Sequence, residues 1–323
     1  MVSTRSWRNG SAAERDFPVE RVSDCIAGGD GFVWVDYTDP AASDLEQVEE
    51  ELGIHALAIE DAVEHGQRPK LDRYRDSRFL VVYDVQGRDE TGALVTHEVK
   101  AFITEHALVT IHGPEFDTRA IERRLDANAD MAGHGVPWLV WALLDEVVDH
   151  ATHAVEAIER DIDELEDDLF ERGNPREQQI QRRSFALRKA LGVLRRLVVP
   201  TKDSVASLLH GDAETIVDGV RPYFRDVEDH LVSIADSVEQ LRDAVSSVMD
   251  TNLNLSSNRQ NTVMKKVTSW AAIIAIPTAI TGFFGQNVTF PGEGHWYGLA
   301  LSLSLIVVSS VLLYRAFRHR DWL

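Results

Sequence analysis

The sequence predicts an α+β membrane protein: an N-terminal α/β cytoplasmic domain, then a long stalk helix that continues into the first of two C-terminal transmembrane helices. Two long apolar runs lie near the C-terminus, at 267–284 and 297–314. No Pro or Gly interrupts the chain between Pro222 and Pro277, which favours one long helix that enters the first run. The first third of the chain contains short β-branched and aromatic runs, which are typical of strands.

The N-terminal part, 1–136, is expected to be the α/β domain. A helix-like segment rich in Leu, Ala and Glu, 43–66, separates the first strand-like run from the other three. The four runs are Phe32–Val35, Phe79–Tyr83, Val99–Ile103 and Leu108–Ile111. A cytoplasmic helical hairpin is expected over 137–213, because Gly173-Asn174-Pro175 breaks a long apolar periodicity.

The stalk helix is expected over 214–266, and its uninterrupted pattern predicts one helix from about Tyr223 to about Phe283. The first transmembrane helix is then 267–284, whose 18 residues give about 27 Å, close to the hydrocarbon thickness of a bilayer. An external loop over 285–296, a second transmembrane helix over 297–317 and a basic tail over 318–323 complete the chain. A buried soluble hairpin is the alternative, and the basic residues that flank both runs disfavour it.

Charged residues give the expected orientation in the membrane. Lys265 and Lys266 precede the first apolar run, and Arg315, Arg318 and Arg320 follow the second. The connecting loop has no Lys or Arg, so the positive-inside rule puts both termini in the cytoplasm. We therefore expect a two-pass protein of the inner or plasma membrane.

The overall charge excludes several classes of function. The chain has 33 basic and 53 acidic side chains, a net charge of −20, and residues 1–264 alone have 28 and 51, a net charge of −23. Because residues 1–264 are this acidic, they repel nucleic acid and attract cations. The single cysteine, Cys25, excludes an intrachain disulfide. No nucleophile–base set or phosphate-binding loop stands out, so we expect neither an enzyme, nor ATP-driven transport, nor an organic cofactor.

Two stripes follow the long helix. One is apolar with a 3–4 spacing, as in a packed seam. The other consists of small or polar residues and Met: Asp250, Asn254, Ser257, Asn261, Met264, Thr268, Ala271, Ala275, Thr278 and Gly282. It fits either a tight helix–helix contact or the wall of a pore. One helix cannot enclose a pore, so the pore requires a ring of identical subunits.

The end of the first transmembrane helix carries candidate ion ligands. Two glycines in 281–287 permit a tight turn, and the amides of Gln286 and Asn287 offer both donors and acceptors at the membrane exit. Neutral oxygens suit hydrated Mg²⁺, which sheds its waters reluctantly.

These motifs resemble the CorA family of magnesium transporters. The similar segments are 258–268 (Asn-Arg-Gln-Asn-Thr-Val-Met-Lys-Lys-Val-Thr), Pro277, Gly285-Gln286-Asn287, the basic tail with Trp322-Leu323, 222–230, Ile59-Glu60-Asp61 and Gln67-Arg68-Pro69-Lys70. The resemblance implies a homopentamer in lipid, with the first transmembrane helix lining the pore.

The resemblance also implies roles for single residues of the pore. Asn287, with Gly285 and Gln286 beside it, matches the selectivity filter. The other matches are Asn261, Met264 and Val267 at the narrow cytosolic neck, Asp250 at a polar ring below it, and Thr278 and Gly282 at pore-facing positions higher up. Thr268, a member of the polar stripe, is a further pore-lining candidate.

Asp61 and Asp226, with Glu60 beside the first, match carboxylates that bind regulatory Mg²⁺ across subunit interfaces and hold the channel closed. One residue departs from the family motif, because Gln286 stands where the family has Met. The departure leaves the ion preference open. Glu293, in the external loop, is expected to concentrate cations near the mouth of the pore.

The leading hypothesis is therefore a homopentameric divalent-cation channel for Mg²⁺, with Co²⁺ or Ni²⁺ as further ions, driven by the electrochemical gradient and gated by intracellular Mg²⁺. Proton-coupled Zn²⁺ transport and a non-conducting membrane-anchored metal sensor stay open as alternatives. A separate metal site at Asp145, Asp149 and His153, which share one helical face, has little support from pattern alone.

Overall fold

The computed structural model describes residues 1–170, 177–211, 218–286 and 294–323. The chain divides into two compact units, Met1–Val248 and Met249–Leu323. Each unit is treated separately below.

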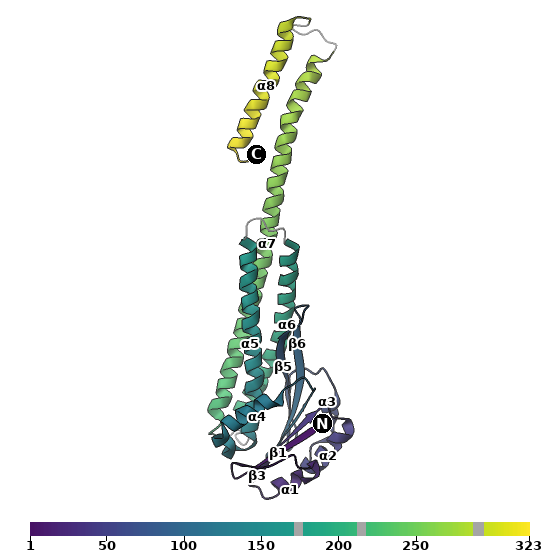
Figure 1. The fold of residues 1–323 in the computed structure, drawn as a ribbon, viewed down its shortest axis with the longest axis vertical. Helices are drawn as coiled ribbons and strands as arrows, with labels where there is room; N and C mark the ends of the chain where they lie inside the picture. The colour runs from purple at the N-terminus through teal and green to yellow at the C-terminus, as the bar shows by residue number, and fades with distance from the viewer. Residues whose placement is uncertain (171–176, 212–217, 287–293) are drawn as a thin grey trace. The chain divides into compact units, whose positions relative to one another are not determined.

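A seven-stranded mixed sheet forms the centre of the first unit (Figure 1). The strands are β1 (Val2–Arg8), β2 (Ser11–Arg15), β3 (Gly31–Thr38), β4 (Lys70–Arg73), β5 (Arg78–Arg88), β6 (Leu94–Ile103) and β7 (Ala107–His112). Their order is β2-β1-β3-β7-β6-β5-β4, and only β3 and β7 pair in parallel. The alternation of side chains along the strands gives the sheet two apolar faces.

Helices cover both faces of this sheet. The short helices α1 (Val22–Ile26), α2 (Ala42–Leu52) and α3 (Ala56–Val63) bury Leu45, Val48 and Ala58 against Val33, Val81 and Phe102 and their neighbours. The opposite face packs on α5 (Val136–Phe170), where Trp138 meets Trp7 edge to face at 5.6 Å between ring centroids. α4 (Thr118–Ala127) and the 3-10 turn η2 (Ala129–His134) pack with α5, whereas the 3-10 turn η1 (Val19–Arg21) packs with α1 and α2.

Three long helices continue from the sheet layer. α6 (Glu177–His210) returns beside α5, and α7 (Arg221–Phe284) begins against both (Figure 1). Trp141 of α5 meets Tyr223 of α7 at 5.3 Å, and Arg195 of α6 pairs with Glu239 of α7. The apolar seam predicted for the stalk is buried at Leu231, Ile234, Val238, Val245 and Val248. The predicted single helix from about Tyr223 to about Phe283 is confirmed.

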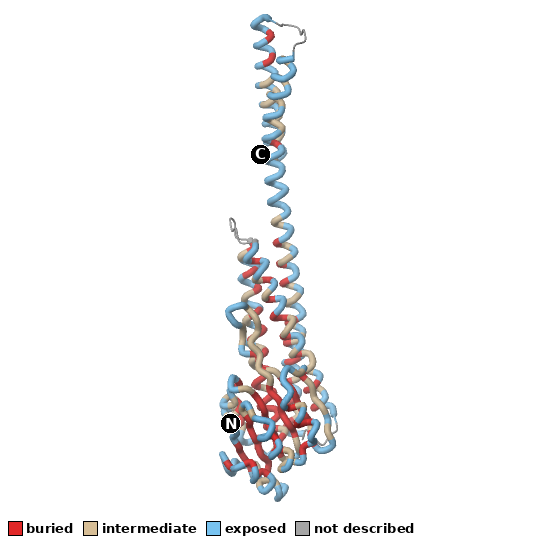
Figure 2. Tube along the Cα trace, turned by 90° about the vertical axis from the view of Figure 1, so that its right-hand side faces the viewer, coloured by how far each residue is buried: buried red, intermediate tan, exposed pale blue. Residues whose placement is uncertain are grey.

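The second unit consists of the last part of α7 and of α8 (Trp296–His319). Both helices contain an 18-residue window apolar enough to cross a membrane, with mean hydropathy 1.6 and 2.0. Only 6% and 11% of these windows are buried, and the tube in Figure 2 is coloured mostly as exposed along both helices. Apolar surface that the chain itself does not cover suits lipid, because a bilayer imposes no cost on exposed Leu, Ile and Val.

Sequence reasoning missed β1, β2, β4 and α4. The sequence pattern did not predict β1, because the buried residues of this strand include Thr4, Arg5 and Ser6 and show no alternation of apolar side chains. Arg5 is tolerated there because its guanidinium pairs with Asp126 and lies over the Trp7 ring. The turn Asn9-Gly10 did carry a signal: both residues have positive φ, 50° and 72°, as the tight turn of a β-hairpin requires.

Gly31 at the start of β3 provides a test of the packing. A Cβ on Gly31 would lie 2.5 Å from the carbonyl oxygen of Cys25, whereas a Cβ on Gly28 meets nothing within 4 Å. We expect Gly31→Ala to lower the free energy of unfolding by about 1–3 kcal/mol, because backbone must move. Gly28→Ala should stay within about 0.5 kcal/mol of wild type. Denaturant unfolding of the detergent-solubilised chain measures both, and equal stabilities would contradict the close approach.

Candidate functional site

The stripe of small and polar residues on α7 lies entirely on an exposed face. All ten members, from Asp250 to Gly282, are exposed in the described structure. Met264 is 65% exposed, and Val267, which lies beside the stripe, is 59% exposed. Above Gly282 lies open space, since a Cβ there would meet nothing within 4 Å. The chain therefore presents a continuous line of polar and small side chains along the membrane half of α7.

A different face of α7 meets α8. Ser269 is fully buried, and in α8 the residues Gly298 and Ser302 are buried. The two helices lie side by side in Figures 1 and 2. Ser269, Gly298 and Ser302 are small residues of the kind that packs helices together in membranes. Packing within one subunit therefore does not explain the exposed stripe.

Hydroxyl groups on α7 have oxygens that can accept hydrogen bonds. Thr278 Oγ1 donates to Ile274 O at 3.0 Å, and Thr281 Oγ1 donates to Pro277 O at 2.8 Å. Each hydroxyl proton is used by the backbone, which leaves the oxygen lone pairs as acceptors. A hydrated cation presents the hydrogens of its waters outwards, so acceptors of this kind fit its hydration shell.

α7 ends in a tight turn at the predicted filter. Gly285 N donates to Thr281 O at 2.9 Å, and Gln286 N donates to Phe283 O at 3.2 Å. A Cβ at Gly285 would lie 3.1 Å from Thr281 O, so glycine keeps this turn close. Gln286 is exposed. Asn287 and Glu293 lie outside the described residues.

Asp61 on α3 faces a lysine of its own chain. Lys70 Nζ of β4 donates to Asp61 Oδ2 at 2.9 Å and lies 2.6 Å from Asp72 Oδ2. Partial burial lowers the pKa of Lys70, but hydrogen bonds and attraction from Asp72 and Asp61 outweigh burial and leave the pKa above its usual value. Lys70 therefore stays charged at neutral pH. Glu60, the neighbour of Asp61, is exposed.

Asp226 lies in the first turns of α7 and points to the surface. Its side chain is 65% exposed and forms an ion pair with His230, at 3.7 Å between Oδ2 and Nδ1. Asp61 is 32% exposed. Both carboxylates can therefore be reached from outside the subunit, although the single chain does not bring them together.

A buried clamp holds the loop that follows α3. Lys100 Nζ of β6 donates to Ala62 O at 2.8 Å and to Glu64 O at 2.5 Å, which caps the C-terminal end of α3. Burial lowers the pKa of Lys100, and neighbouring Glu98 partly offsets this. Glu98 in turn accepts hydrogen bonds from Gly66 N and Gln67 N, both at 3.0 Å. Sequence reasoning missed this clamp, because its members are separated by about thirty residues.

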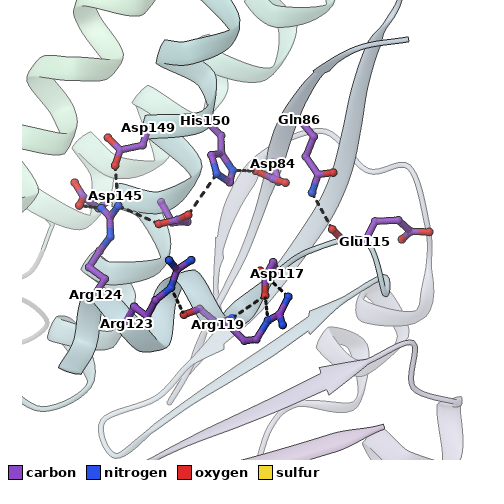
Figure 3. A network of polar contacts seen from close by, with 11 residues as sticks. Asp84, Gln86, Glu115, Asp117, Arg119, Arg123, Arg124, Asp145, Asp149 and His150 are labelled. Carbon is purple, nitrogen blue, oxygen red and sulfur yellow. Dashed lines mark hydrogen bonds and ion pairs between the residues drawn. The ribbon is translucent and has the colours of Figure 1, made fainter. Parts of the chain in front are cut away.

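A second polar network joins α4, α5 and β5 (Figure 3). Arg124 of α4 pairs with Asp145, Glu146 and Asp149 of α5. Asp145 and Asp149, which share a helical face with His153 and for which sequence pattern gave little support as a metal site, are thus paired with an arginine. Within the described ranges no group of three or more His, Cys, Asp or Glu can hold a metal ion.

His150 completes this network, and its neighbours raise its pKa. Its Nδ1 lies 2.5 Å from Oδ1 of Asp84, which is fully buried, and its Nε2 lies 3.4 Å from Oε1 of Glu146. The hydrogen bond to Asp84 raises the pKa of His150, burial opposes it, and Asp84, Glu146 and Asp149 add attraction. A raised pKa stabilises the fold at low pH, and this contribution is lost as pH rises through the folded-state pKa.

We therefore expect His150→Gln to destabilise the protein most below about pH 6, with a difference from wild type that shrinks as pH rises towards 8. The measurement is the melting temperature of the purified chain at several pH values. His153→Gln is the matched control, because His153 lies on the same helix but is exposed. A difference independent of pH would show that His150 is neutral in the fold.

The fold and these surfaces define a two-pass membrane protein with an acidic α/β domain and an exposed polar line on its long helix. Residues 29–319 match the family model described as CorA-like Mg²⁺ transporter protein. The chain belongs to this family, whose members are membrane ion transporters and not enzymes.

Named relatives and solved structures agree with this assignment. The putative metal ion transporter YfjQ of Bacillus subtilis is 32% identical over 95% of this chain and 94% of its own length. The cobalt/magnesium transport protein CorA of Thermotoga maritima is 31% identical over 90% and 83%. The complete structure of the CorA magnesium transporter from Methanocaldococcus jannaschii has a TM-score of 0.78 at 20% identity and covers 100% of this chain and 99% of that one.

Proposed function

We propose that the protein is a homopentameric channel that conducts Mg²⁺, with Co²⁺ and Ni²⁺ as further ions, through the cell membrane. The exposed polar line on α7 carries this proposal, because a face of this kind at membrane depth requires a watery path or a protein partner. Five copies of α7 arranged in a ring would give that path a wall. Names of relatives support the ion class, since both CorA proteins are called cobalt/magnesium transport proteins.

The ion would pass as a hydrated cation along neutral oxygens. Gln286 and Asn287 would receive it at the outer end, helped by Glu293, and the hydroxyl of Thr278 and the amide of Asn261 would accept from its waters. Asp250 and the acidic cytoplasmic domain would favour cations at the inner end. The membrane potential supplies about 2.3 kcal/mol per charge per 100 mV, or about 4.6 kcal/mol for a divalent ion.

Intracellular Mg²⁺ would close the channel at the subunit interfaces. Asp61 of one subunit, with Glu60 beside it, would share an ion with Asp226 of the next, and both carboxylates are accessible. Residues 1–264 have a net charge of −23 per subunit, 28 basic against 51 acidic side chains, so the subunits repel one another. Loss of the bridging ions would therefore let them separate or tilt.

Proton-coupled Zn²⁺ transport is the second candidate. It is favoured by Gln286 in place of the family Met, and by similarity to the zinc transport protein ZntB of Yersinia enterocolitica, 25% identical over 79% of this chain. An amide at this position offers an oxygen acceptor and N–H donors where the family has a thioether. Flux measurements with and without a pH gradient separate the two candidates.

The filter is tested by Asn287→Ala. We expect Mg²⁺ flux into proteoliposomes to fall to background while the oligomer stays intact by size-exclusion chromatography, because a ring of amide oxygens is lost. Mg²⁺, Co²⁺, Ni²⁺ and Zn²⁺ are compared with and without a pH gradient. Ser304→Ala, on the exposed surface of α8, is the control and should conduct normally.

Normal Mg²⁺ flux through Asn287→Ala would remove this residue from the pathway. Zn²⁺ flux that follows the proton gradient would transfer the protein to the second candidate. No flux of any ion through the wild-type protein would leave only a membrane-anchored sensor.

The interface site is tested by Asp61→Lys combined with Asp226→Lys. Each new ammonium repels Mg²⁺ from the site, so the double variant should keep conducting at internal Mg²⁺ concentrations that close the wild type, with an inhibition midpoint at least about tenfold higher. The measurement is flux at increasing internal Mg²⁺. An unchanged midpoint would refute gating at these carboxylates.

A further inference from the structure

The carboxylate of Asp61 is already occupied by a cation that belongs to its own chain. Lys70 Nζ lies 2.9 Å from Asp61 Oδ2 and 2.6 Å from Asp72 Oδ2. The ammonium also lies 5.5 Å from the centroid of the Phe79 ring, and the Lys70 side chain is 31% exposed. Lys70 is thus held between two carboxylates and against an aromatic ring, a position that solvated surface lysines do not have.

Building on the proposed regulatory site, we propose that Lys70 is a tethered competitor of Mg²⁺ for Asp61 and thereby sets the Mg²⁺ concentration at which the channel closes. An ammonium and a hydrated Mg²⁺ repel each other and need the same oxygens. Mg²⁺ binds through one or two carboxylates and retained waters, so it must displace Lys70 or share Asp61 with it. The Asp61 site therefore stays free of Mg²⁺ when the Mg²⁺ concentration is low. It binds the ion only when the concentration is high enough to displace Lys70.

Asp72 gives the displaced ammonium a place to go. Since Lys70 contacts both carboxylates, it can keep its bond to Asp72 while it releases Asp61. The two carboxylates and one ammonium have a net charge of −1, which still attracts a divalent ion. Asp72 and Asp61 therefore both favour Mg²⁺: Asp72 holds the displaced ammonium away from the site, and Asp61 binds the ion.

The backbone around Asp61 is fixed, so the position of Lys70 decides access to the carboxylate. The buried Lys100 caps the end of α3, and Glu98 holds the amides of Gly66 and Gln67. The Gln67 side chain donates to the carbonyl oxygen of Asp61. With α3 and the following loop held in this way, the exchange of cations requires only side-chain movement.

A purely structural ion pair would behave differently. Half-exposed pairs contribute about 0–1 kcal/mol to stability, and removal of either partner acts in the same direction. Competition instead predicts opposite shifts of the Mg²⁺ inhibition midpoint. A variant that removes Lys70 lowers the midpoint, and a variant that removes Asp72, and so leaves Lys70 on Asp61 alone, raises it. The sign of the shift therefore separates competition from simple support of the fold.

The experiment measures inhibition of flux by internal Mg²⁺ in proteoliposomes of the full chain. Lys70→Met should lower the inhibition midpoint roughly fivefold, which corresponds to about 1 kcal/mol for one exposed pair. Asp72→Asn should raise the midpoint, because Lys70 then pairs with Asp61 alone. Lys70→Arg retains the cation and should stay within about twofold of wild type. Mg²⁺ titration by calorimetry on the purified oligomer gives the same order of affinities without flux.

The controls separate this proposal from the regulatory site on which it rests. If Asp61→Asn abolishes Mg²⁺ inhibition but Lys70→Met leaves the midpoint unchanged or raises it, competition by Lys70 is overturned and the site stands. If the wild type is not inhibited by Mg²⁺, or Asp61→Asn leaves the midpoint unchanged, the regulatory site fails and the role of Lys70 fails with it. Opposite shifts in Lys70→Met and Asp72→Asn support the proposal.

Discussion

The structure depends on one constraint: α7 is a single helix whose two parts need different surroundings. Up to Val248 its apolar seam is buried in the first unit. From 253 to 284 only Ser269 is fully buried. Each Å² of apolar surface left in water costs about 25 cal/mol, so an uncovered helix of this length would not persist alone. Lipid suits the apolar sides, and the polar line requires water or another subunit.

The pattern of a long helix is visible in the sequence because its period is local. The seam from Leu231 to Val248 repeats every three or four residues, and no tertiary contact is needed to recognise it. The buried strands with β-branched runs, such as β3 and β7, were recognised for the same reason. β1 was not, because its burial depends on the pairing of Arg5 with Asp126, 121 residues away.

Candidate site residues divide in the same way. The polar line on α7 can be read from spacing, and the structure places all its members on one exposed face. The pairing of Lys70 with Asp61 and Asp72 cannot be read from spacing, since it requires α3 and β4 to fold back on each other. Lys70 was noticed only as part of Gln67-Arg68-Pro69-Lys70, with no partner assigned. Periodicity shows which face a residue occupies, whereas charge partners follow from the tertiary fold.

Cation conduction and cation sensing require binding sites of different strength, and the candidate residues for the two lie in different parts of the chain. Conduction needs weak binding, so that an ion can leave, and in the proposed channel neutral oxygens such as those of Thr278 and Asn261 would provide it. Sensing needs an ion to stay, and carboxylates such as Asp61 and Asp226 bind more strongly. Strong sites in an acidic protein would remain filled at every Mg²⁺ concentration. In the proposed mechanism, the ammonium of Lys70 beside Asp61 would weaken the site and so bring its midpoint into a range where the concentration of the ion can change.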